Sequence, residues 1–378
     1  MYKKFVGIVI FGLLIATAMS AVGNFNEKEK LVSTGFSDSS SNYIISQRNT
    51  KSNNFGGMFI QLPPPPEDSD SSSWTSDSRI EWGYQAYDDF WEVTGPICDI
   101  HWWGCSIYWN GLYWEPCDPP VDMTFNISFY KDDGSGMPGD IVCSYVDVLP
   151  SMTETGIYYW SWVGFYKQLY YFEYDLDPCC QILDGWVSIV CTGNKIDGHF
   201  LWMRSNYGNN QFWQADKFGS WIPHEDDLAF VLTDGESAIP VLECDGEIRQ
   251  TEVPPGTNVT GDFVVRNNGD ADSILQWRID NTSIPNWGSN WTFTPSADFQ
   301  TPDMGWLTVI VNFTAPDEEN KEFTGKIKVV NAIYPREYCE IDVYIKTPRS
   351  KEIYKTFLMQ IFERFPNIFP IIRQLLGL

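Results

Sequence analysis

Short runs in which apolar and polar residues alternate dominate this chain between residues 80 and 347. In one such run, Met123, Phe125 and Ile127 alternate with polar residues, which is the two-residue period of a strand with one buried face. Gly, Pro, Asn and Asp interrupt the runs at short intervals, as turn residues do, and no long stretch has the period of an amphipathic helix. The pattern therefore predicts an all-β fold made of many short antiparallel strands.

The predicted strands fall into two modules, as expected for 378 residues. Residues 80–235 contain many short strand-like runs, the most regular at 122–130 and 169–177, and they favour a jelly-roll β-sandwich. Residues 236–347 contain roughly seven such runs, which is typical of an immunoglobulin-like β-sandwich.

The two ends of the chain differ in composition from these modules. Residues 1–23 have a basic start, an apolar run and small residues suited to cleavage, which predicts a secretory signal peptide. Residues 24–79 are rich in Ser, Asn and Pro, and because such a composition cannot bury a core they predict a disordered tether. Residues 348–378 carry basic residues and apolar residues at helical spacing, which predicts a short amphipathic helix that either docks on a domain or attaches to a membrane or envelope.

The charge of the chain excludes some partners. Its 50 acidic and 25 basic side chains give a formal net charge of -25. We therefore do not expect the protein to bind nucleic acid, because such binding needs a basic surface that neutralises phosphates. The export signal predicts an extracellular protein, and the resemblance described below implies a cell-surface location.

The nine cysteines of an exported protein predict disulfides. Cys244 and Cys339 lie near the first and last strands of the smaller module, so we expect them to be bridged. The other seven are odd in number, and their pairing cannot be deduced from the sequence. Cys98, His101 and Cys105 also suggest a zinc site, but a strand would place Cys98 and His101 on opposite faces, so we favour disulfides.

Parts of the sequence resemble known exported proteins. The stretch 255–270 (P-G-T-N-V-T-G-D-F-V-V-R-N-N-G-D), together with Trp277, Trp287 and 323–325 (F-T-G), resembles the Ig-like accessory modules of prokaryotic proteins, a group that includes BACON and ASH-type repeats. With 98–104 (C-D-I-H-W-W-G) and a tail ending in F-P-x-I-F-P-I-I-R-x-L-L, the layout resembles secreted archaeal surface proteins. The resemblance implies surface display, adhesion or carbohydrate contact.

Aromatic residues supply the candidate ligand site. Most of the 17 tryptophans fall in the first module, and they either fill its core or form an exposed platform. Exposed flat rings suit sugar faces, and Gly and Asn mark a turn between residues 108 and 114, where binding residues tend to lie. The candidate ligand-binding residues are Trp103, Tyr108, Trp109, Tyr113 and Trp114.

Acidic pairs at predicted strand ends supply a candidate calcium site. Carboxylates in extracellular turns can converge on a hard cation, although solvated turn aspartates are the simpler interpretation. The candidates are Asp88, Asp89, Asp132 and Asp133, and the pair Asp226-Asp227 has a similar position. The sequence indicates no other cofactor.

Five N-x-[ST] motifs predict glycosylation sites on the surface, most of them in the second module. The candidate asparagines are Asn126, Asn258, Asn281, Asn290 and Asn312.

These observations favour a non-enzymatic, exported binding or adhesion protein, whose partners are surface glycans or envelope proteins. One alternative is a structural envelope or stalk component without a small-ligand site. A weaker alternative is a glycoside hydrolase, because Glu173, Asp175 and Asp177 share one face of a predicted strand and paired carboxylates can act as acid and nucleophile.

Overall fold

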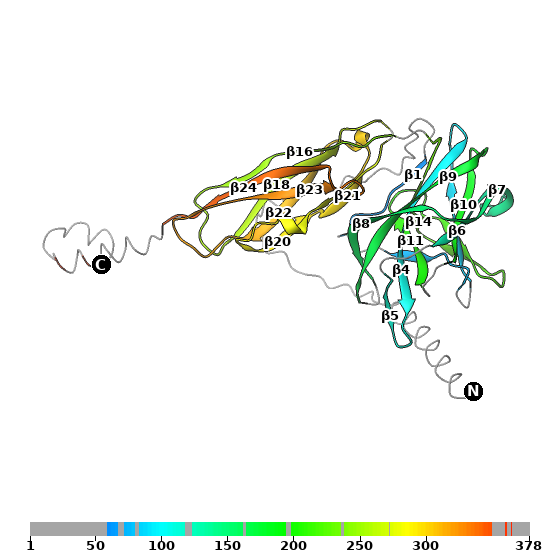
Figure 1. Ribbon diagram of the computed structural model, residues 1–378, viewed down its shortest axis with the longest axis horizontal. Helices are drawn as coiled ribbons and strands as arrows, with labels where there is room; N and C mark the ends of the chain where they lie inside the picture. Colours follow the sequence, from blue (N-terminus) through cyan, green and yellow to red (C-terminus); the bar gives the residue numbers. More distant parts are fainter. Residues whose placement is uncertain are drawn as a thin grey trace, which may run out of the picture. The chain divides into compact units, whose positions relative to one another are not determined.

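The computed structural model describes residues 59–349 apart from 67–71, 80–82, 118–122, 162–163, 194–197, 236–237 and 272, together with Gln360 and Arg364. Regular structure in this part is almost entirely β, with two single-turn 3₁₀ helices, η1 (Asn281–Ser283) and η2 (Pro302–Met304). The strands form four sheets, which confirms the predicted all-β sandwich class (Figure 1).

The first sandwich has a nine-stranded sheet as one layer. Its central strand, β4, pairs with β9 and β5 along one edge and with β15 and β11 along the other. The strands of this sheet are β1 (Phe59–Gln61), β2 (Ser73–Thr75), β4 (Ile97–Trp109), β5 (Trp114–Pro116), β8 (Ser151–Trp160), β9 (Tyr166–Cys180), β11 (Gly198–Ser205), β14 (Asp227–Leu228) and β15 (Phe230–Thr233).

A six-stranded sheet in the order β13-β12-β3-β10-β6-β7 forms the other layer. Strands β3 and β4, like β9 and β10, follow one another in the chain but belong to different sheets, which is the connectivity of a jelly-roll type of sandwich. The strands of this sheet are β3 (Gln85–Phe90), β6 (Thr124–Asp132), β7 (Pro138–Val148), β10 (Gly185–Gly193), β12 (Phe212–Ala215) and β13 (Trp221–His224).

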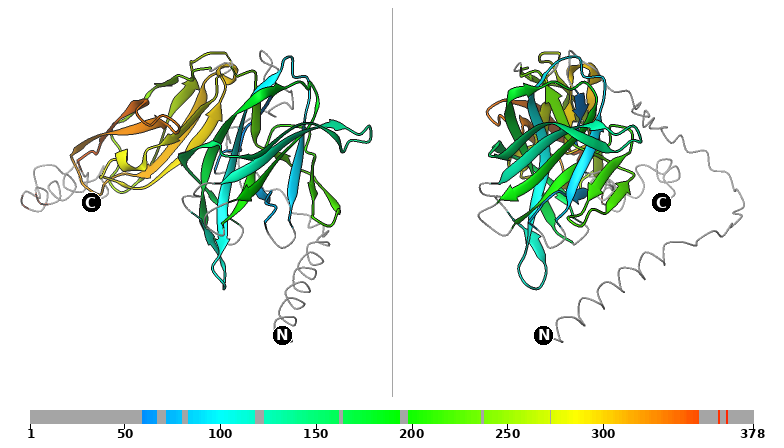
Figure 2. Two further views of the ribbon diagram at one scale, coloured as in Figure 1. Left: turned by 45° about the vertical axis from the view of Figure 1, so that its right-hand side comes forward. Right: turned by 90° about the vertical axis from the view of Figure 1, so that its right-hand side faces the viewer.

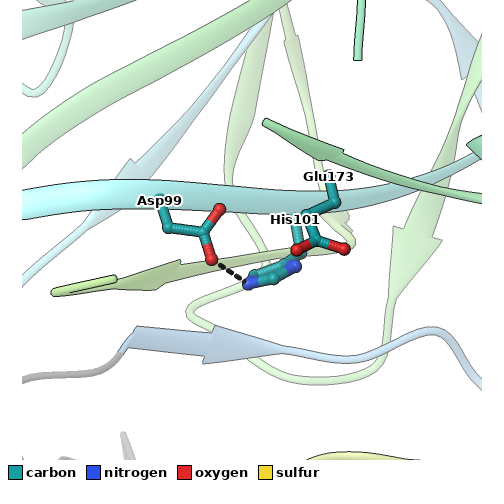
Figure 3. A group of neighbouring side chains, drawn as sticks. All are labelled: Asp99, His101 and Glu173. Atoms are coloured by element: carbon teal, nitrogen blue, oxygen red, sulfur yellow. Dashed lines mark ion pairs between the residues drawn. The ribbon is translucent and has the colours of Figure 1, made fainter. Parts of the chain in front are cut away.

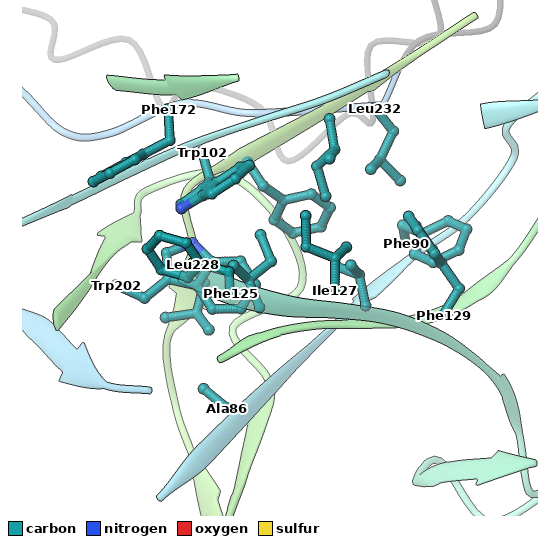
Figure 4. Close-up of a cluster of buried hydrophobic side chains, with 14 of the residues drawn as sticks. Ala86, Phe90, Trp102, Phe125, Ile127, Phe129, Phe172, Trp202, Leu228 and Leu232 are labelled. Atoms are coloured by element: carbon teal, nitrogen blue, oxygen red, sulfur yellow. The ribbon is translucent and has the colours of Figure 1, made fainter. Parts of the chain in front are cut away.

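Aromatic and aliphatic side chains fill the space between these two layers. Phe125, Ile127 and Phe129 of β6 are buried, whereas Thr124 and Asn126 are only partly buried, as the alternation predicts. Ser128 departs from the alternation, since it is buried too. Figure 4 shows these side chains together with Trp102 of β4 and Phe172 of β9, which come from the opposite layer. The Trp102 and Phe172 rings are stacked, with centroids 5.4 Å apart.

Part of the predicted tether belongs to the first sandwich instead. Strand β1 pairs with β15 and strand β2 pairs with β11, and the side chains of Phe59 and Leu62 are buried. The tether prediction is therefore wrong for residues 59–66 and 72–79, because a few apolar residues in a polar segment are enough to add short strands to an existing sheet. The rest of the tether lies outside the described residues.

The second sandwich has a four-stranded sheet facing a five-stranded one (Figures 1 and 2). Its core centres on Trp277, which is fully buried and donates from Nε1 to Gln300 Oε1 at 3.1 Å. The first sheet contains β16 (Leu242–Asp245), β18 (Asn258–Asn267), β20 (Ser289–Thr294) and β22 (Leu307–Thr314). The second contains β17 (Glu247–Gln250), β19 (Leu275–Ile279), β21 (Ala297–Gln300), β23 (Glu322–Asn331) and β24 (Tyr338–Lys346).

Two of the three disulfides among the described residues join the layers of a sandwich. Cys143 of β7 is bonded to Cys180 of β9 in the first sandwich. Cys244 of β16 is bonded to Cys339 of β24 in the second, which confirms the predicted bridge. The third disulfide joins Cys98 to Cys179 within the nine-stranded sheet. The zinc alternative is therefore wrong, since Cys98 has no free thiolate.

The predicted signal peptide lies outside the described residues. So does the predicted tail helix, apart from Gln360 and Arg364, which are helical. Among the described residues, we find no helix with the length and apolarity needed to span a membrane.

We predict that Gly104→Ala destabilises the first sandwich by about 2 kcal/mol, as overpacking of a core typically does. A Cβ at Gly104 of β4 would overlap the ring of Phe200 and lie 2.8 Å from the Leu201 carbonyl oxygen. Urea unfolding of the two proteins measures the difference. Gly95→Ala is the matched control, because a Cβ there meets nothing within 4 Å; equal stabilities of the two variants would contradict the close packing.

Candidate functional site

The β4–β5 hairpin brings together four of the five predicted ligand-binding aromatics. Trp109 and Trp114 lie directly opposite each other in the ladder, with ring centroids 5.4 Å apart in an edge-to-face arrangement. Trp109 is 48% exposed and Tyr113 is 57% exposed, whereas Tyr108 and Trp114 are partly buried. Figure 1 shows this hairpin at the end of β4.

Hydrogen bonds hold the turn of this hairpin in one conformation. The side-chain oxygen of Asn110 accepts from the backbone N–H groups of Leu112 at 2.8 Å and Tyr113 at 3.0 Å. Its amide nitrogen donates to Glu115 Oε1 at 2.9 Å, and the hydroxyl of Tyr108 donates to the other Glu115 oxygen. These donors, that of Tyr108 first, hold the pKa of the Glu115 carboxyl below its usual range. The hairpin therefore carries an ionised carboxylate beside its exposed rings.

Trp103, the fifth predicted residue, is not part of this surface. Its side chain is 0% exposed and packs against Phe299 of β21, with centroids 5.7 Å apart, and against Tyr171 of β9. The prediction is wrong for Trp103 because Phe299 and Tyr171 cover it; on this face of β4 the exposed residue is Trp109, at the end of the strand.

A second exposed aromatic pair, which the sequence analysis missed, ends the β8–β9 hairpin. Trp160 lies opposite Tyr166 in the ladder, with centroids 4.9 Å apart. Trp160 is 54% exposed, Tyr166 62% and Tyr158 48%. The signal for this pair was a cluster of aromatic residues on both sides of a turn.

The two hairpins lie at the same end of the nine-stranded sheet. Strand β9 is antiparallel to β4, so its first residues lie toward the last residues of β4. Strands β5 and β9 also share one edge of β4, because β11 and β15 occupy the other. This end of the sheet therefore presents two aromatic pairs.

The predicted calcium ligands only partly converge. Asp88 and Asp89 of β3 lie beside Asp227 of β14, and one carboxylate oxygen from each lies within 4.8 Å of the others, close enough for a cation to bridge them. Asp132 and Asp133 do not join this cluster. They are exposed and accept backbone N–H groups of their own turn, and Asp132 Oδ2 also accepts from Trp186 Nε1 at 3.2 Å.

Backbone and side-chain donors contact each carboxylate of the cluster, although Asp89 Oδ1 has no hydrogen-bond partner among the described residues. Asp227 accepts from the backbone N–H groups of Asn209, Asn210 and the residue after them, and Asp89 Oδ2 accepts from the Asn209 amide at 2.7 Å. Burial, together with the charges of Asp227 and Asp89, raises the pKa of Asp88 well above its usual range. Burial also raises the pKa of Asp89 to about 7 and that of Asp227 to about 6.

We predict that Asp89→Asn changes the pH dependence of stability. Between about pH 4 and pH 7 the raised pKa keeps a proton on Asp89 in the folded chain, whereas the unfolded chain has lost that proton. The contribution of this group to the free energy of unfolding is therefore fully favourable below about pH 4 and is lost as the pH rises through about 7. The wild type should therefore lose on the order of 2–4 kcal/mol relative to the variant between pH 4 and pH 8. Denaturant unfolding across this range measures it. Asp140→Asn, which removes the same charge from an exposed position, is the control; parallel profiles for wild type and Asp89→Asn would contradict the prediction.

The candidate glycosylation sites lie on the surface of the described structure. Asn258, Asn290 and Asn312 lie on adjacent strands of the four-stranded sheet, β18, β20 and β22. Asn281 lies in η1, and Asn126 lies on β6, where its Oδ1 accepts from the backbone N–H of Asp147 at 2.9 Å. All five side chains are exposed or partly exposed, as a glycan requires.

The chain matches no protein-family model and no curated protein. Among solved structures it is similar to the ASH/PapD-like domain of human CEP192, with 10% identity over 29% of this chain and 86% of that one, at a TM-score of 0.21. It is also similar to a protein of unknown function from Porphyromonas gingivalis W83, with 9% identity over 60% of this chain and 86% of that one, at a TM-score of 0.21. At these TM-scores neither likeness carries an argument about function. The three disulfides of the described residues do indicate an oxidising, extracellular environment.

Proposed function

We propose that this protein is an extracellular binding protein whose first sandwich binds surface carbohydrate through the end of the β4–β5 hairpin. The observation that supports the proposal is the cross-strand pair of Trp109 and Trp114, in which Trp109 keeps half of its surface in solvent. Other large rings of this sandwich, such as Trp102 and Trp202, are fully buried, whereas Trp109 lies largely outside the core.

Flat rings of this kind suit sugars for two reasons. An indole face offers a large contact area to the C–H groups of a sugar ring, and a tryptophan loses little side-chain entropy on binding. The turn is also preorganised, because Asn110 already holds the backbone N–H groups of Leu112 and Tyr113.

A hydrogen-bonding group lies beside the rings, as a sugar site requires. Both oxygens of Glu115 accept hydrogen bonds from the hairpin, and an ionised carboxylate has further lone pairs for sugar hydroxyls. The second aromatic pair, Trp160 and Tyr166, gives the same end of the sheet another contact for a longer glycan or for a neighbouring surface.

We predict that Trp109→Ala with Tyr113→Ala weakens binding to a glycan array by about tenfold or more, the usual effect of losing anchoring aromatics. Both side chains are about half exposed, so their loss should leave the fold intact. Binding is measured first on the array and then by calorimetry with the best glycan. Trp306→Ala is the matched control, because this side chain is 42% exposed but belongs to the second sandwich.

Two results would argue against the proposal. If the double variant binds the glycan array as strongly as the wild type does, the β4–β5 hairpin is not part of the binding site. Failure of the wild type to bind any glycan, with the protein instead recovered in envelope pellets, would favour the structural alternative.

A further inference from the structure

A second group of polar side chains, unrelated to the aromatic hairpins, gathers on the outer face of the nine-stranded sheet. Asp99 and His101 are two residues apart on β4 and so share a face, and Glu173 of β9 lies directly opposite His101 in the ladder. His101 Nε2 is 2.6 Å from Asp99 Oδ2. One ligand atom from each of the three residues lies within 4.8 Å of the others. Figure 3 shows the contact between Asp99 and His101, with the Glu173 carboxylate beside the imidazole ring.

These side chains line a cavity of about 140 Å³ that contains buried polar atoms without a partner. Asp99 is only 7% exposed, and its Oδ1 has no hydrogen-bond partner among the described residues. Gln276 lines the same cavity, is 2% exposed, and has an Oε1 that is likewise unpartnered within the described part of the chain. A buried acceptor without a partner is costly, so both oxygens call for a donor or a cation in the cavity.

The charge of the cavity favours a cation. Asp99 and Glu173 bring two carboxylates, whereas the described lining residues include no lysine or arginine. His101 is the single group there that could carry positive charge. A divalent ion would balance the two carboxylates and give the Asp99 oxygen its missing partner.

The ligand set also selects the kind of ion. Calcium and magnesium take oxygen ligands, whereas one imidazole with two carboxylates suits zinc and other first-row divalent metals. Tyr171 lies in a supporting position, because its hydroxyl is 2.5 Å from His101 Nδ1 and its ring stacks on the imidazole. Such a contact fixes the ring and directs Nε2 toward Asp99, as the outer partners of metal-ligating histidines do.

We propose that Asp99, His101 and Glu173 bind one divalent transition-metal ion of the zinc type. Three protein ligands leave an open coordination position that faces the cavity, which is the arrangement of zinc sites that take water or a small ligand as the fourth group. Trp103 Nε1, which lines this cavity and is a buried donor without a partner among the described residues, could donate to that fourth group.

The test is calorimetric titration of the chelator-treated protein with Zn²⁺, followed by Co²⁺ absorption spectra as a report on coordination. We expect one ion per chain at this site, and a dissociation constant at least about tenfold higher in His101→Gln and in Glu173→Gln. Glu173→Gln keeps the bond between His101 and Asp99, so it tests the site even where His101→Gln folds poorly. The thermal melting temperature without metal identifies a variant that fails to fold.

Two control variants separate this site from the rest of an acidic surface. Asp140→Asn removes an exposed carboxylate, and Asp89→Asn removes a carboxylate of the other acidic cluster, which the proposed site does not include. Both should bind Zn²⁺ as the wild type does. The proposal is overturned if the wild type does not bind Zn²⁺, or if His101→Gln and Glu173→Gln leave the zinc affinity and the Co²⁺ spectra unchanged. Water would then be the occupant of the cavity. Glycan binding is measured separately, so either proposal can fail alone.

Discussion

The burial of strand β4 on both faces is the constraint on which the rest of this structure depends. Trp102 points into the space between the two layers of the first sandwich, and Trp103, the next residue, points the other way against Phe299. Both rings are 0% exposed. Both edges of β4 are also paired, with β9 and β5 on one side and β15 and β11 on the other. A strand held in this way cannot shift its register without moving every side chain to the wrong face.

Because β4 is fixed, its polar residues are fixed as well. Asp99 and His101 lie on the covered face, where a charged group must find a partner or lose its charge. Their short contact to each other, with the carboxylate of Glu173 opposite, brings three ionisable groups together on this face of the sheet. The Asp88, Asp89 and Asp227 cluster responds differently: backbone and amide donors surround it, and its carboxyls have raised pKa values.

The aromatic residues divide according to their distance from the turns. In the middle of the strands, rings such as Phe125 and Phe172 pack edge to face and fill the space between the layers. At the last residues of β4 and β8 there is no opposite layer to cover them, and Trp109 and Trp160 remain half exposed. The same residue type therefore stabilises the core at one position and offers a binding surface at another.

The sequence by itself determined the strands, since the two-residue alternation along β6 and β9 is a local property that can be read from consecutive residues. It also determined the Cys244–Cys339 bridge, because the first and last strands of a small sandwich lie near each other. Only the tertiary structure decided that Trp103 is covered and that residues 59–61 form a strand. It also decided that Asp227 lies beside Asp88 and that Glu173 lies beside His101. These facts depend on which distant strands pair and in which register, and periodicity along the chain contains no information about strand partners.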